Sequence, residues 1–366
     1  MFGPIPARAA RSVAALAFLI VLLSSAFGSQ ARPAAAQENC PQPGAATSLT
    51  GAGATFPAPI YTRWFAEYKN LCGVEINYQA IGSGGGIRQH TERTVAFGAS
   101  DGILTQAQKD AAPGTLMIPT VAGAVAIVVN IPGIQPGQLR LSPDTLARIY
   151  QGEITRWDDE RLRADNSSLS LPNLDVIVVR RSDGSGTTNI FTSYLSVISS
   201  GWARDVGAGN SVSWPVGLGG EGNAGVAGQV RQLPGAIGYV ELAYATQNNM
   251  AWATLRNQAG NWLEPSLAAT TAAMEGVAIP ESTEVMIVDS ANPDAYPIAG
   301  FTWILVYENQ PNAAVARTLA SALWWATHDG QSFATQLEYA PLAPAAQAAA
   351  EAQIRRILVD GQPALP

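Results

Sequence analysis

One local pattern recurs along this chain and limits what it can fold into: an apolar strand, then a polar glycine-rich loop, then a helix. The pattern occurs at residues 48–68, 74–94 and 176–194, and its strand and loop occur again at 95–101. Strands that alternate with helices through short loops predict a mostly parallel sheet, and hence an α/β fold. Ligands of such sheets bind beyond the carboxyl ends of the strands, so we expect these loops to face a single cleft.

The loop within 176–194 is the most polar of the set. Val176–Val179 is a run of β-branched residues that predicts a buried strand, and a helix is predicted from Asn189 onward. Between them stand Arg181, Asp183 and several glycine and hydroxyl residues. Backbone N–H groups at a helix start, hydroxyls and a guanidinium together favour an oxyanion. An ionised Asp183 can only accept hydrogen bonds, so this anion has to carry a proton.

The other loops carry residues that fit the same chemistry. Thr55 stands where a helix N-cap is expected, and Asp101 ends the third strand. Gly82–Gly86 is a predicted loop before a helix at Ile87–Thr94. Taken singly, each has a structural explanation, as a cap, a flexible turn or, for Arg181, the partner of a surface salt bridge. Loops of this kind at matching strand ends instead favour one binding site.

Two long apolar runs predict strands that connect two halves of the protein. Val121–Asn130 and Pro297–Tyr307 are interpreted as the two crossings of a hinge, which makes the first domain discontinuous. The fold class that follows is two α/β domains joined by a two-stranded hinge. The predicted bounds are 47–120 together with 297–366 for domain 1, and 121–296 for domain 2.

The N-terminus has the layout of a secretory signal peptide. Arg8 and Arg11 precede the apolar run Val13–Leu23 and a stretch of small residues. That run is shorter than the about 20 apolar residues that span a bilayer, and the alternative interpretation is a buried core helix. We predict a signal peptide over 1–36, with cleavage between residues 28 and 36.

A linker is predicted over 37–46, and it contains the first of the two cysteines, Cys40 and Cys72. No lipobox precedes Cys40, so a lipid anchor is not expected, and the mature protein is predicted to be periplasmic or extracellular. In that oxidising compartment the two cysteines either form one disulfide or leave one buried and one mobile thiol.

Composition excludes several classes of partner. Only 13% of the residues are charged, the net charge is −7 and the sequence pI is about 4.9, so nucleic acid is not an expected partner. An anionic ligand then has to be held by local dipoles and hydrogen bonds, because long-range attraction has the wrong sign. Two cysteines and two histidines, His90 and His328, lack the spacing of metal ligands, so no metal is predicted.

A cofactor is not predicted either. Gly217–Gly222 matches the dinucleotide pattern G-x-G-x-x-G, but Ser213–Val216 before it contains a proline and is a poor central strand. We therefore expect a surface or cleft loop at Gly217–Gly222.

Catalysis by a serine nucleophile has weak support. Ser83 and Ser185 stand in suitable loops, but a base must lie within reach of the hydroxyl, and only two histidines are available. His90 is expected on the surface, about two helical turns below the loop, and His328 is expected to end a helix. No catalytic residue is predicted, and the protein is not expected to be an enzyme.

Long motifs in this chain resemble the phosphate-binding protein of the bacterial high-affinity phosphate ABC importer. The segments are TGAGATFPAPIY, IGSGGGIRQ, VAFGASD, VVRRSDGSGTTNIFTSYL, WPVGLGG and LPGAIGYVE. They span roughly residues 47–310, and the C-terminal helices are less distinctive. The resemblance implies a type II periplasmic-binding-protein fold that closes over one dehydrated phosphate. It also implies a monomer that delivers inorganic phosphate to the transmembrane subunits of an ABC permease.

The same resemblance implies which residues bind the ligand. They are Thr55, Phe56, Ser83, Asp101, Arg181, Asp183, Ser185, Gly186 and Thr187. In that family the ATF motif binds through the threonine hydroxyl and a backbone N–H, and all of these positions match. Gly84 departs from the family, because a second small hydroxyl residue often stands there, and we expect the change to be silent.

Phosphate near neutral pH carries one or two protons, so its site needs acceptors as well as donors. We hypothesise that Asp101 is the main discriminator against sulfate, which has no proton to give, and that Asp183 both accepts and orients Arg181. Two alternatives stand beside this interpretation. One is a secreted phosphate scavenger or sensor without a permease, and the other is an extracellular phosphatase or esterase that uses Ser83 or Ser185.

Overall fold

A computed structural model describes Cys40 and residues 45–365 of the chain. The predicted signal peptide lies outside the described residues, as does most of the predicted linker. The strands are β1 (Ser48–Gly53), β2 (Glu75–Ala80), β3 (Phe97–Ser100), β4 (Thr115–Val129), β5 (Arg140–Leu141), β6 (Ile177–Arg181), β7 (Leu218–Gly220), β8 (Ala236–Glu241), β9 (Ala251–Trp252), β10 (Thr254–Arg256), β11 (Trp262–Leu263), β12 (Ala299–Tyr307), β13 (Leu358–Val359) and β14 (Gln362–Pro363).

Helices alternate with these strands, as the recurring pattern predicts. They are α1 (Ala58–Cys72), α2 (Ser83–Thr91), α3 (Gln106–Ala111), α4 (Pro143–Gln151), α5 (Glu160–Asp165), α6 (Gly186–Ile198), α7 (Ser200–Asp205), α8 (Gly222–Gln232), α9 (Leu242–Gln247), α10 (Leu267–Met274), α11 (Ala313–Thr327) and α12 (Pro344–Arg355), with 3-10 turns η2 (Asp329–Phe333) and η3 (Thr335–Leu337). In the described part of the chain no helix is long and apolar enough to span a membrane.

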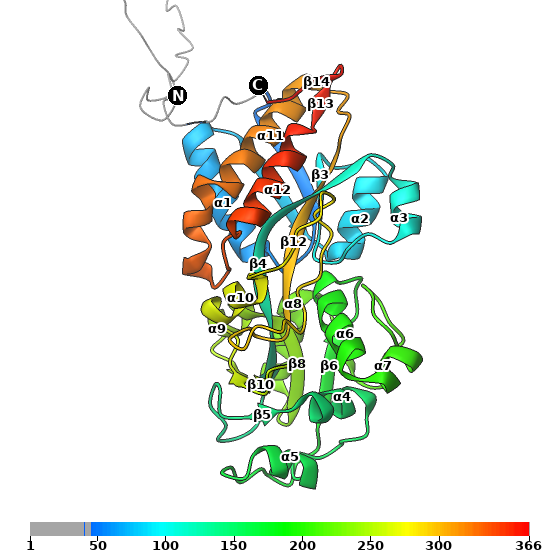
Figure 1. Cartoon of the computed structure of the whole chain (residues 1–366), viewed down its shortest axis with the longest axis vertical. Helices are drawn as coiled ribbons and strands as arrows, with labels where there is room; N and C mark the ends of the chain where they lie inside the picture. The colour runs from blue at the N-terminus through cyan, green and yellow to red at the C-terminus, as the bar shows by residue number, and fades with distance from the viewer. Residues whose placement is uncertain (1–39, 41–44, 366) are drawn as a thin grey trace, which may run out of the picture.

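Most of the strands form one nine-stranded sheet in the order β2-β1-β3-β12-β4-β8-β6-β7, with β9 beside β4. Figure 1 shows an upper lobe, with α1, α11 and α12 on one side of the strands and α2 and α3 on the other. A lower lobe contains β6, β7 and β8 with α4 to α9 (Figure 1). Within the upper lobe β1 pairs in parallel with β2 and β3, and within the lower lobe β6 pairs in parallel with β7 and β8. The strands predicted at the start of residues 48–68 and 74–94, within 95–101 and at 176–179 are therefore present. The sheet is nevertheless mixed, and the prediction of a mostly parallel sheet was wrong, because the long strands β12 and β4 pair antiparallel with their neighbours.

The strand β4 runs through both lobes. It begins before the expected Val121 and pairs antiparallel with β12 from Thr115 to Ala124. From Val125 to Val129 it pairs antiparallel with β8 instead. Every residue of β12 is buried, and so is all of β4 except its first residue, because helices cover both faces. The two long apolar runs thus form the adjacent strands at the centre of the sheet.

Glycine is needed where α2 packs against the upper sheet. The sequence predicted a loop at Gly82–Gly86, but α2 already begins at Ser83, so that prediction was wrong. The reason is close packing: a Cβ on Gly86 would lie 2.4 Å from the Cα of Gly53 and 2.7 Å from the carbonyl oxygen of Ala99. Tertiary packing outweighs the low helix propensity of glycine here, because only glycine lets the helix approach β1 and β3 this closely.

The two cysteines form a disulfide that attaches Cys40 to the end of α1. Their Cα atoms are 5.4 Å apart, and Cys72 is the last residue of the helix. The structure thus decides between the two alternatives for these cysteines, and the buried and mobile thiols are excluded. Within the described residues no group of three or more His, Cys, Asp or Glu side chains could hold a metal ion.

Candidate functional site

The predicted loops meet where the two lobes touch. The backbone N–H of Gly84 donates to the carbonyl oxygen of Gly184 at 2.8 Å, and that of Gly186 donates to Ser83 Oγ at 3.0 Å. A Cβ on Gly186 would lie 2.6 Å from the Cβ of Asp101. Loops that end β3 and precede α2 in the upper lobe therefore lie directly against the loop between β6 and α6 in the lower lobe.

Ser83 is fully buried at the first position of α2. Its hydroxyl oxygen accepts from the backbone N–H of Asp101 at 3.3 Å and from that of Gly186 at 3.0 Å. A hydroxyl has two lone pairs and one proton. Because both lone pairs are used, Ser83 has only a proton left to offer to a ligand or to the neighbouring carboxyl of Asp101.

Asp101 is a buried carboxyl that changes its charge near neutral pH. It is 1% exposed, and its Oδ1 accepts from Thr302 Oγ1 at 2.8 Å. Burial raises the pKa of Asp101 to about 7, against the opposing effects of the Thr302 hydrogen bond and the Arg181 charge. Such a group can accept a proton from a ligand or give one to it, so it suits a ligand that is itself partly protonated.

The buried Arg181, at the end of β6, forms an ion pair with the partly exposed Asp183. Arg181 Nε donates to Asp183 Oδ1 at 2.7 Å, Arg181 Nη2 donates to Asp183 Oδ2, and the backbone N–H of Gly222 donates to Oδ1 at 3.0 Å. Burial alone would raise the pKa of Asp183, but the hydrogen bonds and charge of Arg181 outweigh it and lower that pKa below its usual value. Asp183 is therefore ionised, and both of its oxygens hold the guanidinium in place.

The start of α6 adds backbone donors to the site. Ser185 caps the helix, because its Oγ accepts from the backbone N–H of Thr188 at 3.0 Å. Ser185 and Thr187 are fully buried, and Gly186 is the first helical residue. The helix was predicted from Asn189, so it begins earlier than expected, and its first N–H groups lie beside Ser83 and Asp101.

Thr55 and Phe56 stand in the segment between β1 and α1. The predicted N-cap role of Thr55 was wrong, because α1 begins at Ala58 after Pro57 and has no side-chain cap. The carbonyl of Thr55 accepts from Tyr244 OH at 2.6 Å, and that of Phe56 accepts from Tyr339 OH at 2.6 Å. Peptide C=O and N–H groups point in opposite directions, so these hydrogen bonds fix where the backbone N–H groups of the segment point.

Two residues that the sequence did not predict complete the site. Asn223 is fully buried at the start of α8, and its Nδ2 donates to Thr55 Oγ1 at 2.8 Å and to Thr187 Oγ1 at 3.1 Å. Thr302 stands in β12 beside Asp101. Thr302 is the one threonine or serine inside the apolar run Pro297–Tyr307, and that was its signal. Asn223 had only its position beside the weak Gly217–Gly222 motif.

The structure brings all nine predicted residues to this place. Asn223 joins Thr55 to Thr187, Thr187 contacts Arg181 at 3.4 Å, and Ser83 joins Asp101 to Gly186. The assembled groups are hydroxyls, helix-start N–H groups, one guanidinium and one carboxyl that titrates near neutral pH. This set fits a small oxyanion that carries at least one proton.

The histidines do not support a serine nucleophile. The predicted surface position of His90 was wrong: it is 2% exposed, its Nε2 lies 2.9 Å from Thr115 Oγ1, and its ring stacks on Tyr307 at 4.3 Å. The apolar interior between α2 and β12 takes up the ring because Thr115 satisfies its nitrogen. His328 follows the end of α11 as predicted, and its Nε2 lies 3.1 Å from Glu351 Oε1.

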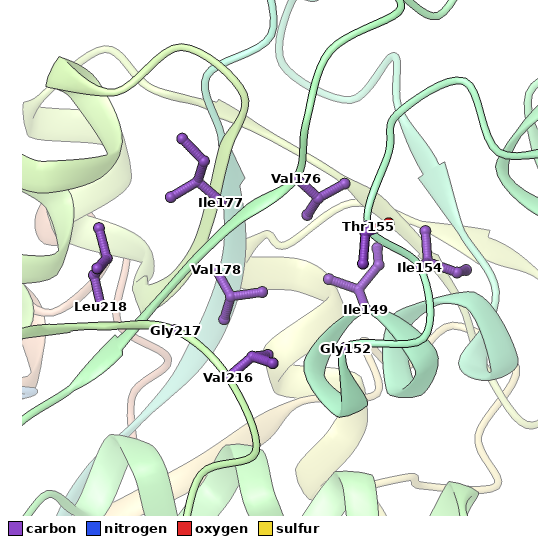
Figure 2. Close-up of a pocket in the computed structure, with 10 residues that line it drawn as sticks. All are labelled: Ile149, Gly152, Ile154, Thr155, Val176, Ile177, Val178, Val216, Gly217 and Leu218. Atoms are coloured by element: carbon purple, nitrogen blue, oxygen red, sulfur yellow. The ribbon is translucent and has the colours of Figure 1, made fainter.

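A separate cavity lies in the lower lobe and shares no residue with this site. Its volume is about 310 Å³, and Figure 2 shows mostly aliphatic side chains around it. The lining residues are Ile149, Gly152, Ile154, Thr155, Val176, Ile177, Val178, Val216, Gly217 and Leu218. No charged side chain is among them, so this cavity offers nothing to an oxyanion.

Comparison with family models and comparison with known protein sequences give results that agree with each other. A family model described as the PBP superfamily domain matches residues 40–324. The chain is 44% identical over 304 residues to the phosphate-binding protein PstS of Haemophilus influenzae, covering 81% of this chain and 89% of that protein. It is 42% identical over 298 residues to the phosphate-binding protein PstS of Xylella fastidiosa strain 9a5c, covering 81% and 82%.

A solved structure shares the fold of most of this chain. The phosphate-binding protein from Stenotrophomonas maltophilia superposes with a TM-score of 0.64 at 21% identity, and the match covers 84% of this chain and 94% of that one. Identity at this level shows a common fold.

Proposed function

We propose that this chain, which belongs to the family of phosphate-binding proteins of phosphate ABC importers, holds phosphate between its two lobes at the site described above. The resemblance of the sequence motifs to that family is confirmed, and so is the type II periplasmic-binding-protein fold. The chain is a solute-binding protein of a phosphate transporter and not an enzyme.

The proposed phosphate ligands come from both lobes. They are Thr55, Phe56, Ser83, Asp101, Arg181, Asp183, Ser185, Gly186 and Thr187. The observation that supports this set best is the contact of Ser83 and Asp101 in the upper lobe with the start of α6 in the lower lobe. Anion donors and a titrating carboxyl are brought together there only because the lobes touch.

The role of Asp101 in selectivity follows from its charge. A phosphate proton and the Asp101 proton are interchangeable across one hydrogen bond, so protonated phosphate is accommodated whichever group carries the proton. Sulfate brings no proton, so above the Asp101 pKa of about 7 an ionised, buried carboxylate would face an oxyanion without a hydrogen bond between them, and selectivity against sulfate should be greatest there. Asp183 is less suited to this task because Arg181 and Gly222 already donate to its oxygens.

Replacement of Asp101 by asparagine tests the proposal. We expect Asp101→Asn to weaken phosphate binding and to strengthen sulfate binding, so that the ratio of the two affinities falls by about tenfold or more, because an amide can donate to sulfate where a carboxylate cannot. Calorimetry of the mature protein with phosphate, arsenate and sulfate measures the ratio.

A matched control uses another aspartate of the same lobe. Asp110 is exposed on α3, where its Oδ1 accepts from Gln106 Nε2, so Asp110→Asn should leave the affinity ratio at its wild-type value. An unchanged ratio in Asp101→Asn would remove Asp101 from its proposed role. Absence of phosphate binding by the wild-type protein would remove the whole proposal.

Further parts of the proposal concern organisation and location. We propose a monomer whose domain 1 comprises residues 47–120 and 297–366 and whose domain 2 comprises 121–296. This division is supported by the way β4 changes its partner from β12 to β8 at Val125. We also propose export through a cleaved signal peptide and docking on the transmembrane subunits of a phosphate permease.

A further inference from the structure

Asn223 occupies a position from which it contacts ligand residues of both lobes. It is fully buried at the start of α8 in the lower lobe, next to Gly222. Its backbone N–H and its Nδ2 both donate to Thr55 Oγ1 of the upper lobe, at 3.2 and 2.8 Å. Its Nδ2 also donates to Thr187 Oγ1 of α6 at 3.1 Å.

The orientation of the Asn223 amide is determined by a backbone donor. The N–H of Glu241 points at Asn223 Oδ1 over 2.9 Å. A backbone N–H needs an acceptor, so the atom that faces it must be the amide oxygen. The amide nitrogen, which has two protons to donate, therefore faces the two threonine hydroxyls.

This arrangement leaves each threonine hydroxyl with only a proton to offer. Thr55 Oγ1 accepts twice from Asn223. Thr187 Oγ1 accepts from Asn223 and from Arg181 Nη1 at 3.4 Å. Two lone pairs per hydroxyl are thereby used, and among the described residues no acceptor takes either hydroxyl proton.

We infer that Asn223 is a positioning residue that turns Thr55 and Thr187 into obligate hydrogen-bond donors and so sets the donor pattern that selects the ligand. The inference rests on the proposed function, because it assumes that both hydroxyls face phosphate. It has a chemical consequence: neither threonine can accept a proton from the ligand, so the P–OH groups depend on Asp101. Asn223 itself does not need to touch phosphate for this.

The direct test removes the amide and compares two pH values. We expect Asn223→Ala to weaken phosphate binding about tenfold to hundredfold at about pH 8.5, where the phosphate dianion needs donors most. The loss should be several-fold smaller at about pH 5.5, because hydroxyls freed from Asn223 can rotate and accept from the second proton of the monoanion. Calorimetric affinities of variant and wild type are compared at each pH, so that effects common to both proteins cancel.

Asn166 provides a matched control for a buried asparagine that makes three hydrogen bonds. Its Oδ1 accepts from the N–H of Arg140 at 2.7 Å, and its Nδ2 donates to the carbonyls of Arg140 and Leu162, both at 2.8 Å. Asn166→Ala should lower stability and leave phosphate affinity at its wild-type value at both pH values. A merely structural role of Asn223 would make the two alanine variants behave alike.

Asn223→Asp keeps the shape of the side chain and decides the question if the alanine variant does not fold. One carboxylate oxygen still accepts from Glu241 N–H, but the other accepts from the threonine hydroxyls and draws their protons away from the ligand. We expect a larger loss of affinity than in Asn223→Ala at about pH 8.5, with partial recovery at about pH 5.5.

Three outcomes would overturn the inference: wild-type affinity in Asn223→Asp, wild-type affinity in Asn223→Ala, or an equal loss at both pH values in a folded variant. The wild-type protein separates these results from failure of the proposed function. If it binds phosphate while the Asn223 variants do so equally well, only the inference fails. If it does not bind phosphate, the proposed function fails first.

Discussion

Buried residues with polar groups carry much of the pH dependence expected of this protein. Glu241 is fully buried at the end of β8, and burial raises its pKa well above the usual value for a glutamate. Its Oε2 accepts from Ala243 N–H at 2.9 Å and lies 2.9 Å from the Tyr339 hydroxyl, whose one proton goes to the Phe56 carbonyl at 2.6 Å. A protonated Glu241 adds no negative charge near the proposed phosphate site, to which it is linked through Asn223, and this is consistent with a function in anion binding.

The pKa of His90 is shifted downward, in the direction opposite to that of Glu241. Burial, reinforced by the charge of Arg93, lowers the pKa of His90 to about 4. A folded-state pKa below the unfolded value means that the stability contributed by the neutral ring is complete above about pH 6.5 and is lost as the pH falls toward 4. His90→Phe keeps a ring against Tyr307 but has no titrating group at this position. As the pH falls from about 6.5 to about 4, we expect its unfolding free energy to fall by roughly 2–3 kcal/mol less than that of the wild type.

Urea denaturation at several pH values measures the effect, and NMR titration of the wild-type ring locates its pKa. Parallel pH profiles of unfolding free energy for His90→Phe and the wild type would contradict this assignment. The hydrogen bond to Thr115 is lost in the variant at every pH, so it shifts the profile without changing its slope.

At the scale of elements, the packing of α2 against the sheet determines which of its positions require glycine. Gly85 and Gly86 are neighbours in this helix but face different surroundings. A Cβ on Gly85 would meet the end of the flexible Ile81 side chain at 2.8 Å, whereas a Cβ on Gly86 would meet the backbone of Gly53 at 2.4 Å. Side-chain ends can move, but strand backbones cannot.

We therefore expect opposite results from two alanine substitutions in α2. Gly86→Ala should lower the unfolding free energy by about 2 kcal/mol or more, since the helix has to move away from β1 and β3. Gly85→Ala should be neutral or stabilise by up to about 1 kcal/mol, because alanine favours the helix. Chemical denaturation of the two variants side by side measures the difference, and equal effects would show that packing against the sheet does not restrict residue 86.

At the scale of the whole molecule, the structure shows the two lobes in contact through the binding site. Tyr244 OH of the lower lobe donates to the Thr55 carbonyl of the upper lobe, and Gly84 N–H donates to Gly184 across the same boundary. The strands β4 and β12 are adjacent at the centre of the sheet. Hinge motion about those strands is the kind of closure expected of two lobes that share a ligand.

Glycine at residue 186 is expected to permit this closure. A Cβ there would lie 2.6 Å from the backbone nitrogen of Asp101, so Gly186→Ala should hold the lobes slightly apart and weaken phosphate binding by about tenfold or more. Unfolding of the phosphate-free protein should be little affected, because separated lobes leave room for the methyl group. Calorimetry and denaturation measure the two effects.

Gly228 in α8 is the control, because a Cβ there would have no heavy atom within 4 Å. Gly228→Ala should bind phosphate as the wild type does. Small-angle scattering of the wild type should also show a smaller radius of gyration with phosphate than without it. Identical dimensions in both conditions would argue against closure, and wild-type affinity in Gly186→Ala would argue against the tight contact with Asp101.

Local patterns in the sequence were sufficient to predict the α/β fold, the positions of its main strands along the chain and the loops that meet at the site, but not the order of the strands in the sheet. They suffice because hydrophobic periodicity, glycine loops and helix starts depend on neighbours in the chain. The carboxyl ends of parallel strands lie at the same edge of a sheet. Arg181, Asp101 and Ser83 stand at or just after such ends, so they could be grouped before their distances were known. The resemblance of whole motifs to a family then supplied the ligand.

Only the tertiary structure decided which polar residues are buried and what they contact. His90 looked like a surface residue on its own helix, but β12 covers it and Tyr307 stacks on its ring. Asn223 and Thr302 come from distant segments, and their functions exist only because α8 and β12 bring them to Thr55 and Asp101. Burial and hydrogen-bond partners depend on contacts between distant parts of the chain, and no local pattern encodes those contacts.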